Sequence, residues 1–162
     1  MSLQTAIHQL PPAGEPGQLA STEASQLKNA IPSCRAATSV KCGGFAFATS
    51  APTSAVDAGL QEQWVGSAGS AVVGFVYRVQ DAALPCNASA TLAYGSGQPV
   101  PVAEAGAFYC PIANGGTVGQ KVLADVTDGT ASAGDSATSA AIDTGFVLKT
   151  AVSSGGIAII QK

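Results

Sequence analysis

From residue 30 onward, apolar side chains recur at every second position and Gly-rich turns separate the runs. Phe45 and Phe47 alternate with alanines, and Val73, Phe75 and Tyr77 occupy alternate positions of a later run. A period of two is typical of a β-strand with one buried face, whereas an amphipathic helix repeats about every 3.6 residues. No run after residue 30 has helical spacing. The pattern therefore predicts an all-β domain, a small β-sandwich or a barrel-like fold.

Three parts of this pattern give more detailed predictions. Residues 72–79 form a central strand, and the face that carries Phe75 packs on four residues near the C-terminus: Phe146, Leu148, Ile157 and Ile159. Pro99 and Pro101 indicate an edge position, because proline cannot donate to a β-ladder. The polar stretch Thr130–Ala141 is expected to be a long surface loop of small residues.

Residues 1–29 are expected to form an extended arm ahead of the β-rich domain, which spans residues 30–162. The proline cluster at 11–16 fixes φ and removes backbone donors. Ser21–Leu27 has a Ser cap and a nearby Glu, which would suit one short helical turn. The first part of the arm is too short and too proline-broken to bury its own apolar side chains. We therefore expect these residues to contact another surface: Leu3, Ile7 and Leu10.

Charged residues make up only 10% of the chain, where an ordinary soluble domain carries roughly 25%. The 7 Lys and Arg are scattered singly and the net charge is -3, so no basic patch for nucleic acid is expected. No window approaches the ~20 apolar residues of a membrane span. The N-terminus lacks the basic region of a secretory signal, which predicts synthesis in the cytoplasm. A surface with so little charge suits close packing against neighbours.

The residue types that catalysis and metal binding need are scarce. The chain has 1 His, His8, and none of its 4 Cys forms a C-x-x-C pair. Gly66–Ser70 does not match the Gly-x-Ser-x-Gly nucleophile elbow, and no His follows it to act as a base. We therefore expect no enzyme activity, no metal site and no cofactor.

The cysteines and the single tryptophan each have two interpretations. Cys34 with Cys42, and Cys86 with Cys110, would each close a local loop through a disulfide; alternatively, the cysteines are small buried hydrophobes. Trp64 follows a polar run and is either a core anchor or an anchor at an interface with the protein's partner or with a sister copy.

The order of several segments carries a resemblance to a known family. The segments are Pro-Gly-Gln-Leu-Ala (16–20), Gly-Phe-Ala-Phe (44–47), Val-Val-Gly-Phe-Val-Tyr-Arg (72–78), Pro-Val-Ala-Glu-Ala-Gly-Ala-Phe (101–108), Val-Gly-Gln-Lys-Val (118–122), Ile-Asp-Thr-Gly-Phe-Val-Leu-Lys-Thr (142–150) and Ile-Ala-Ile-Ile (157–160). From about residue 14 to its end, the chain resembles the structural cement, or head decoration, proteins of tailed bacteriophages.

This resemblance implies a non-enzymatic virion protein on the exterior of the capsid. Such a protein would bind as a homodimer or homotrimer and bridge neighbouring subunits of the major capsid protein. Leu3, Ile7, Leu10 and Trp64 would then contact the capsid or a sister copy. The alternative is a phage adhesin or receptor-binding β-domain. An adhesin would be expected to carry aromatic residues in its exposed loops, and Thr130–Ala141 contains none.

Overall fold

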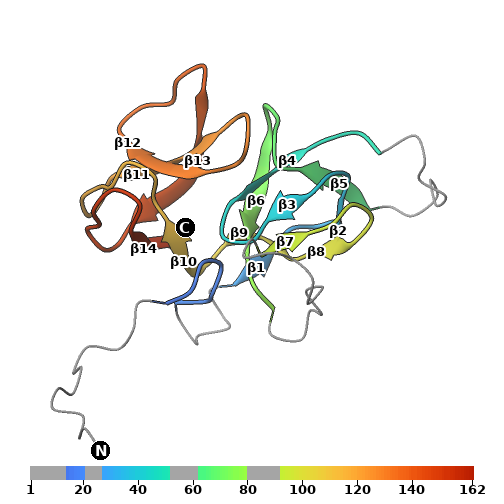
Figure 1. Ribbon diagram of the computed structural model, residues 1–162, viewed down its shortest axis with the longest axis horizontal. Helices are drawn as coiled ribbons and strands as arrows, with labels where there is room; N and C mark the ends of the chain where they lie inside the picture. Colours follow the sequence, from blue (N-terminus) through green and yellow to red (C-terminus); the bar gives the residue numbers. More distant parts are fainter. Residues whose placement is uncertain (1–13, 21–26, 52–61, 80–91) are drawn as a thin grey trace, which may run out of the picture.

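A computed structural model shows an all-β fold, as the sequence predicts (Figure 1). The structure describes residues 14–20, 27–51, 62–79 and 92–162, which form three sheets and contain no helix. The largest sheet has seven strands, in the order β1 (Lys28–Asn29), β9 (Val102–Ala105), β6 (Val72–Val76), β4 (Phe45–Ala48), β5 (Gln63–Gly66), β2 (Cys34–Ala36) and β8 (Pro99–Val100).

The seven-stranded sheet curls back on itself. Strands β8 and β9 lie near opposite ends of the strand order, yet only Pro101 separates them along the chain. The concave face encloses a cluster of small and β-branched side chains that includes Ala36, Val65 and Val76. A two-stranded sheet, β3 (Val40–Lys41) and β7 (Ala93–Tyr94), adds Val40 and Tyr94 to this cluster. This half of the molecule is barrel-like.

The second half is a five-stranded antiparallel sheet (Figure 1, gold to red). Its order is β10 (Ala107–Pro111), β14 (Ile157–Gln161), β13 (Ala141–Leu148), β11 (Lys121–Asp125) and β12 (Ala131–Gly134). Its inner face packs against the convex face of β4, β6 and β9, and the larger core cluster lies between them. The central strands β4 and β6 are therefore buried on both faces. The fold combines a sandwich and a barrel-like sheet that share these strands.

Four phenylalanines join the two large sheets. Phe45 and Phe75 come from β4 and β6, whereas Phe108 and Phe146 come from β10 and β13, and all four are at most 1% exposed. The Phe75 ring centroid lies 4.9 Å from that of Phe108 and 5.4 Å from that of Phe45. The Phe45 and Phe146 rings meet edge to face at 5.7 Å. Tilted and edge-to-face pairs of this kind contribute about 0.5–1.5 kcal/mol each beyond their burial.

A β-bulge in β6 changes the expected face of one valine. Phe45 is opposite Phe75, but Phe47 is opposite Val72, so one extra residue lies in β6 between these pairs. Val72 consequently packs on the same cluster as Phe75, and Val73 packs on the cluster inside the curled sheet. The prediction that Val73 shares a face with Phe75 was wrong, because strict alternation does not allow for an inserted residue.

The inward face of β14 also differs from the expectation. Ala158 and Ile160 are buried in the core between the sheets, whereas Ile157 and Ile159 are only half-buried. Residues 157–160 are all apolar, so the alternation cannot say which face points inward. The pairing of β14 with its neighbours determines which face points inward, because Ile160 lies opposite Phe108 on one side and Leu148 on the other.

The stretch expected to be one long loop contains strand β12, so that prediction was wrong. Ala131 and Ala133 are buried, and only residues 135–140 remain as an exposed connection. The outer edge of β12 is occupied by the Asn114 side chain. Its Nδ2 donates to the Ala133 carbonyl at 2.7 Å and its Oδ1 accepts from the Ala133 N–H at 2.8 Å. The edge prediction for Pro99 is confirmed, since β8 is the last strand of its sheet.

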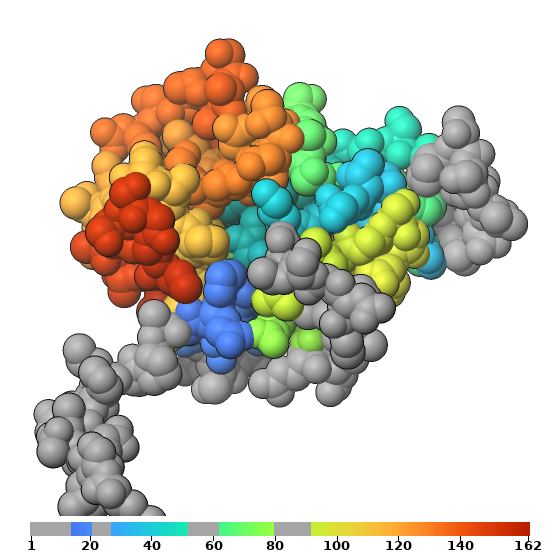
Figure 2. All heavy atoms as spheres, in the orientation of Figure 1, coloured from blue at the N-terminus to red at the C-terminus, as the bar shows by residue number. Residues whose placement is uncertain are grey.

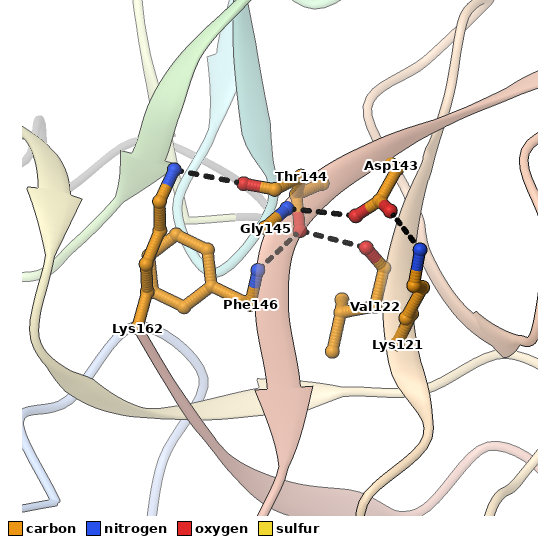
Figure 3. A network of polar contacts seen from close by, with 7 residues as sticks. All are labelled: Lys121, Val122, Asp143, Thr144, Gly145, Phe146 and Lys162. Atoms are coloured by element: carbon orange, nitrogen blue, oxygen red, sulfur yellow. Dashed lines mark hydrogen bonds and ion pairs between the residues drawn. The ribbon is translucent and has the colours of Figure 1, made fainter.

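Strand β13 contains an irregular step that side chains stabilise (Figure 3). Gly145 has a φ of +78°, in the left-handed region that glycine tolerates. Asp143 Oδ1 accepts the Gly145 N–H at 2.9 Å, and Thr144 Oγ1 donates to the Val122 carbonyl at 2.7 Å. Lys162 Nζ donates to the Thr144 carbonyl at 3.1 Å. These bonds compensate for the interrupted ladder and hold Phe146 in the core.

We expect Phe75→Ala to lower the free energy of unfolding by about 3–5 kcal/mol, the range for removing a fully buried phenylalanine. Phe75 contacts rings from both sheets, so its loss leaves a cavity at their junction. Urea denaturation measures the change. Val118→Ala is the control, because Val118 is 63% exposed and its loss should change stability by less than about 0.5 kcal/mol. An unchanged midpoint for Phe75→Ala would contradict the assigned core.

Candidate functional site

The described residues hold no arrangement suited to acid–base or metal chemistry. They contain no group of three His, Cys, Asp or Glu that could hold a metal ion. Hydrogen bonds and nearby cations lower the pKa of several carboxyls, whereas a catalytic acid needs a raised one. These carboxyls are Glu62, Glu104, Asp125 and Asp143. No helix in the described part of the chain is long and apolar enough to span a membrane.

Oppositely charged side chains neutralise one another across the surface. Lys28 Nζ lies 2.7 Å from Glu104 Oε2, and Lys121 Nζ lies 2.7 Å from Asp143 Oδ2. Arg35 binds Glu62 through both Nε, at 2.5 Å, and Nη2, at 3.1 Å. Exposed pairs such as Lys28–Glu104 contribute only about 0–1 kcal/mol each to stability. Their larger effect is to leave little unbalanced charge on a surface that already carries few charges.

The segment Gly14–Ala20 adds to the free edge of β10 (Figure 2, blue atoms beside gold). The Gly17 N–H donates to the Tyr109 carbonyl and the Tyr109 N–H to the Gln18 carbonyl, each at 2.9 Å. The Gly17 carbonyl accepts the Arg78 N–H at 2.8 Å, and the Arg78 guanidinium pairs with Glu15. The segment therefore bonds to both halves of the molecule.

These contacts correct the expected boundary of the arm. Residues 14–20 were expected to belong to the extended arm, with contacts outside the domain expected for residues 1–17, but residues 17–20 bond to the chain's own sheets. The physical reason is that β10 would otherwise present unpaired backbone groups at a sheet edge, and residues 17–20 satisfy them. Leu3, Ile7 and Leu10 lie outside the described residues, as does nearly all of the expected helical turn at 21–27.

The docked segment requires glycine at position 17. Gly17 has a φ of +81°, and a Cβ there would lie 2.5 Å from Cys42 Sγ. We expect Gly17→Ala to loosen the segment and to speed hydrogen exchange at the Gly17 and Tyr109 amides, measured by mass spectrometry. Gly97→Ala is the matched control, because Gly97 also has a φ of +81° but has no atom within 4 Å of such a Cβ. Equal exchange at these amides in the two variants would contradict the docking.

Three of the cysteines are buried free thiols: Cys34, Cys42 and Cys110. Cys34 Sγ lies 3.8 Å from the Pro32 carbonyl, whereas Cys42 Sγ lies 3.9 Å from the Pro16 carbonyl. The structure thus holds free thiols in place of the Cys34–Cys42 disulfide that the sequence allowed. Cys110 is fully buried in the core between the sheets. Its proposed partner, Cys86, lies outside the described residues.

Burial raises the pKa of the Cys34 and Cys42 thiols to about 11 and raises that of Cys110 as well. The thiolate is the nucleophile, so at pH 8 we expect iodoacetamide to modify these three thiols only after denaturation. The folded thiols keep protons that unfolded ones release near pH 9, so their contribution to stability falls as the pH rises above about 9. Peptide mass spectrometry and urea titrations at pH 8 and 10 measure both effects. Rapid alkylation of the native protein would contradict this burial.

Trp64 lies on β5 and belongs to neither core cluster. Its neighbour Val65 is fully buried, whereas Trp64 itself is half-buried on the opposite face of the strand. It stands opposite Arg35 in the parallel pair β2–β5. Trp64 thus packs in neither core cluster of the described residues, and its role at an interface stays a prediction.

An apolar groove that the sequence did not indicate lies at the seam of the curled sheet. Its volume is about 440 Å³, and its lining includes Ala30, Val79, Pro99 and Val102. Ile31, in the turn beside it, is 84% exposed, the largest exposure among the large apolar side chains that the structure describes. An exposed isoleucine has no signature in a single sequence, because every isoleucine there appears equally suited to the core.

The described part of the chain is an all-β scaffold with few charged side chains and an apolar groove at its surface. A family model described as "Structural cement protein (E217 gp24/Pam3 gp6)" matches residues 3–162, so the chain belongs to the phage structural cement protein family. No curated protein matches it. The protein is therefore a non-enzymatic component of the virion capsid that binds capsid proteins and stabilises the phage head.

Proposed function

We propose that the protein binds the outer surface of the assembled head as a homodimer or homotrimer and bridges neighbouring major capsid subunits. The observation that carries this proposal is the anchoring of Gly14–Ala20 across both halves of the fold. Residues 1–13 thereby start from a fixed point at the edge of β10. Fully extended, they would reach at most about 45 Å, enough to pass beyond a domain of this size.

The chemistry of residues 1–13 suits a contact outside the domain. The segment has no Asp, Glu, Lys or Arg, and its large apolar side chains are spread along its length: Leu3, Ile7 and Leu10. An extended segment of this kind can lie in a groove between subunits or pair with a sheet edge. Its two prolines reduce the conformational entropy lost on ordering. The proposed partner of the segment is the capsid or a sister copy.

A cement protein of this design stabilises the head by linkage. Because it binds assembled shells and not dissociated subunits, its binding free energy adds to the stability of the shell. An oligomer touches several subunits at once, so modest individual contacts combine into tight overall binding. The half-buried Trp64 is proposed as one such contact, since tryptophan is enriched among the residues that dominate interface energies.

Deleting residues 2–13 tests the role of this segment. We expect the truncated protein to keep the wild-type unfolding midpoint, because the docked residues 14–20 remain, and to bind cement-free expanded heads at least about tenfold more weakly. Co-sedimentation measures the affinity, and light scattering after gel filtration measures the oligomeric mass. A triple change to serine at Leu3, Ile7 and Leu10 is the length-matched control and should weaken binding similarly. Full affinity and an unchanged oligomer for both variants would contradict the proposal.

A further inference from the structure

Residues from both ends of the seven-stranded sheet line the apolar groove, since β1 and β9 stand at one end of the strand order and β8 at the other (strands labelled in Figure 1). The lining includes Asn29 of β1, Val102 of β9, Cys34 of β2 and Pro99 of β8. Pro99 and Pro101 carry no N–H, so this edge is poorly suited to accept an added strand. A ligand of the groove is therefore expected to bind through side chains.

The described residues that line the groove carry no charge. The Tyr77 hydroxyl donates to Asn29 Oδ1 at 2.9 Å, and the other lining side chains are mainly aliphatic or proline. Val79, which lines the groove, is 36% exposed, and Ile31, which follows the lining residue Ala30 in the chain, is 84% exposed. The nearby charges of Lys28 and Arg35 are held in ion pairs with Glu104 and Glu62. The chemistry of the groove therefore favours an uncharged apolar segment over a charged ligand.

The size of this surface distinguishes between a capsid protein and a second copy as its partner. Ten described residues line the groove, whereas a stable interface between two proteins uses about 20–30 residues on each side. Alone, the groove is too small to hold a stable homodimer. A small apolar contact suits binding to a lattice, where the contacts made by one oligomer act together.

We propose that the groove and Ile31 form a capsid-docking surface that receives an uncharged, apolar segment from the outer face of the major capsid protein lattice. This assignment depends on the capsid-bridging function proposed above and gives it a particular surface. Ile31 is the anchor residue, since it lies in the chain between the lining residues Ala30 and Ser33, is largely exposed and packs in neither core cluster.

The test compares Ile31→Ser with Val118→Ser in the full chain. Both side chains are exposed, at 84% and 63%, but Val118 lies in the turn between β10 and β11 of the other sheet. Binding to cement-free expanded heads is measured by co-sedimentation, together with the melting temperature and the oligomeric mass. We expect Ile31→Ser to weaken binding at least about tenfold and Val118→Ser to leave it within about twofold. Val79→Ser, at the same opening, should weaken binding in the same direction.

Three outcomes would overturn the assignment. Wild-type affinity of Ile31→Ser would show that the surface does not touch the capsid. A lowered oligomeric mass of Ile31→Ser would mean that the surface is an interface between copies of this protein. A lower melting temperature for Ile31→Ser than for Val118→Ser would mean that the chain itself covers this surface. Failure of the wild-type protein to bind heads would instead refute the proposed function as a whole, and so the two failures are distinguishable.

Discussion

The contact of Phe45 and Phe75 with Phe108 and Phe146 determines how the two large sheets lie against each other. Backbone bonds reinforce it, since Phe45 N–H donates to the Gly129 carbonyl and Gly69 N–H to the Val126 carbonyl, each at 2.9 Å. The anchoring of Gly14–Ala20 depends on this arrangement, because Gly17 bonds to Tyr109 of one sheet and to Arg78 beyond β6 of the other. The aromatic core thus determines where the segment Gly14–Ala20 is anchored.

Sheet edges are a hazard for a protein that gathers in many copies on one shell, because unpaired backbone groups promote pairing between chains. Here the chain covers or blunts three of the edges in its described part. Residues 17–20 pair with β10, the Asn114 amide occupies β12, and Pro99 removes a donor from β8. Covering these three edges lowers the risk that one chain pairs with another through its backbone.

Low charge has a clear physical role in a cement protein. Burying an ion at an interface carries a desolvation penalty, so a surface with few charges can be covered at little cost. In the described part of the chain, most charged side chains form ion pairs, as in Arg35–Glu62 and Lys121–Asp143. Binding then depends on apolar contact and avidity, and it should vary little with ionic strength.

The sequence by itself determined the all-β class, the buried Phe75, the edge position of Pro99 and the scarcity of catalytic groups, because alternation and composition are local properties of the chain. Tertiary structure decided the rest. Val73 changed face because a bulge lengthens β6, and Ile160 rather than Ile159 turned inward because of its partners Phe108 and Leu148. Residues 14–20 joined the fold because β10 has a free edge, and the groove beside Ile31 exists only because the sheet curls. Each of these depends on contacts between residues distant in the chain, which no local pattern encodes.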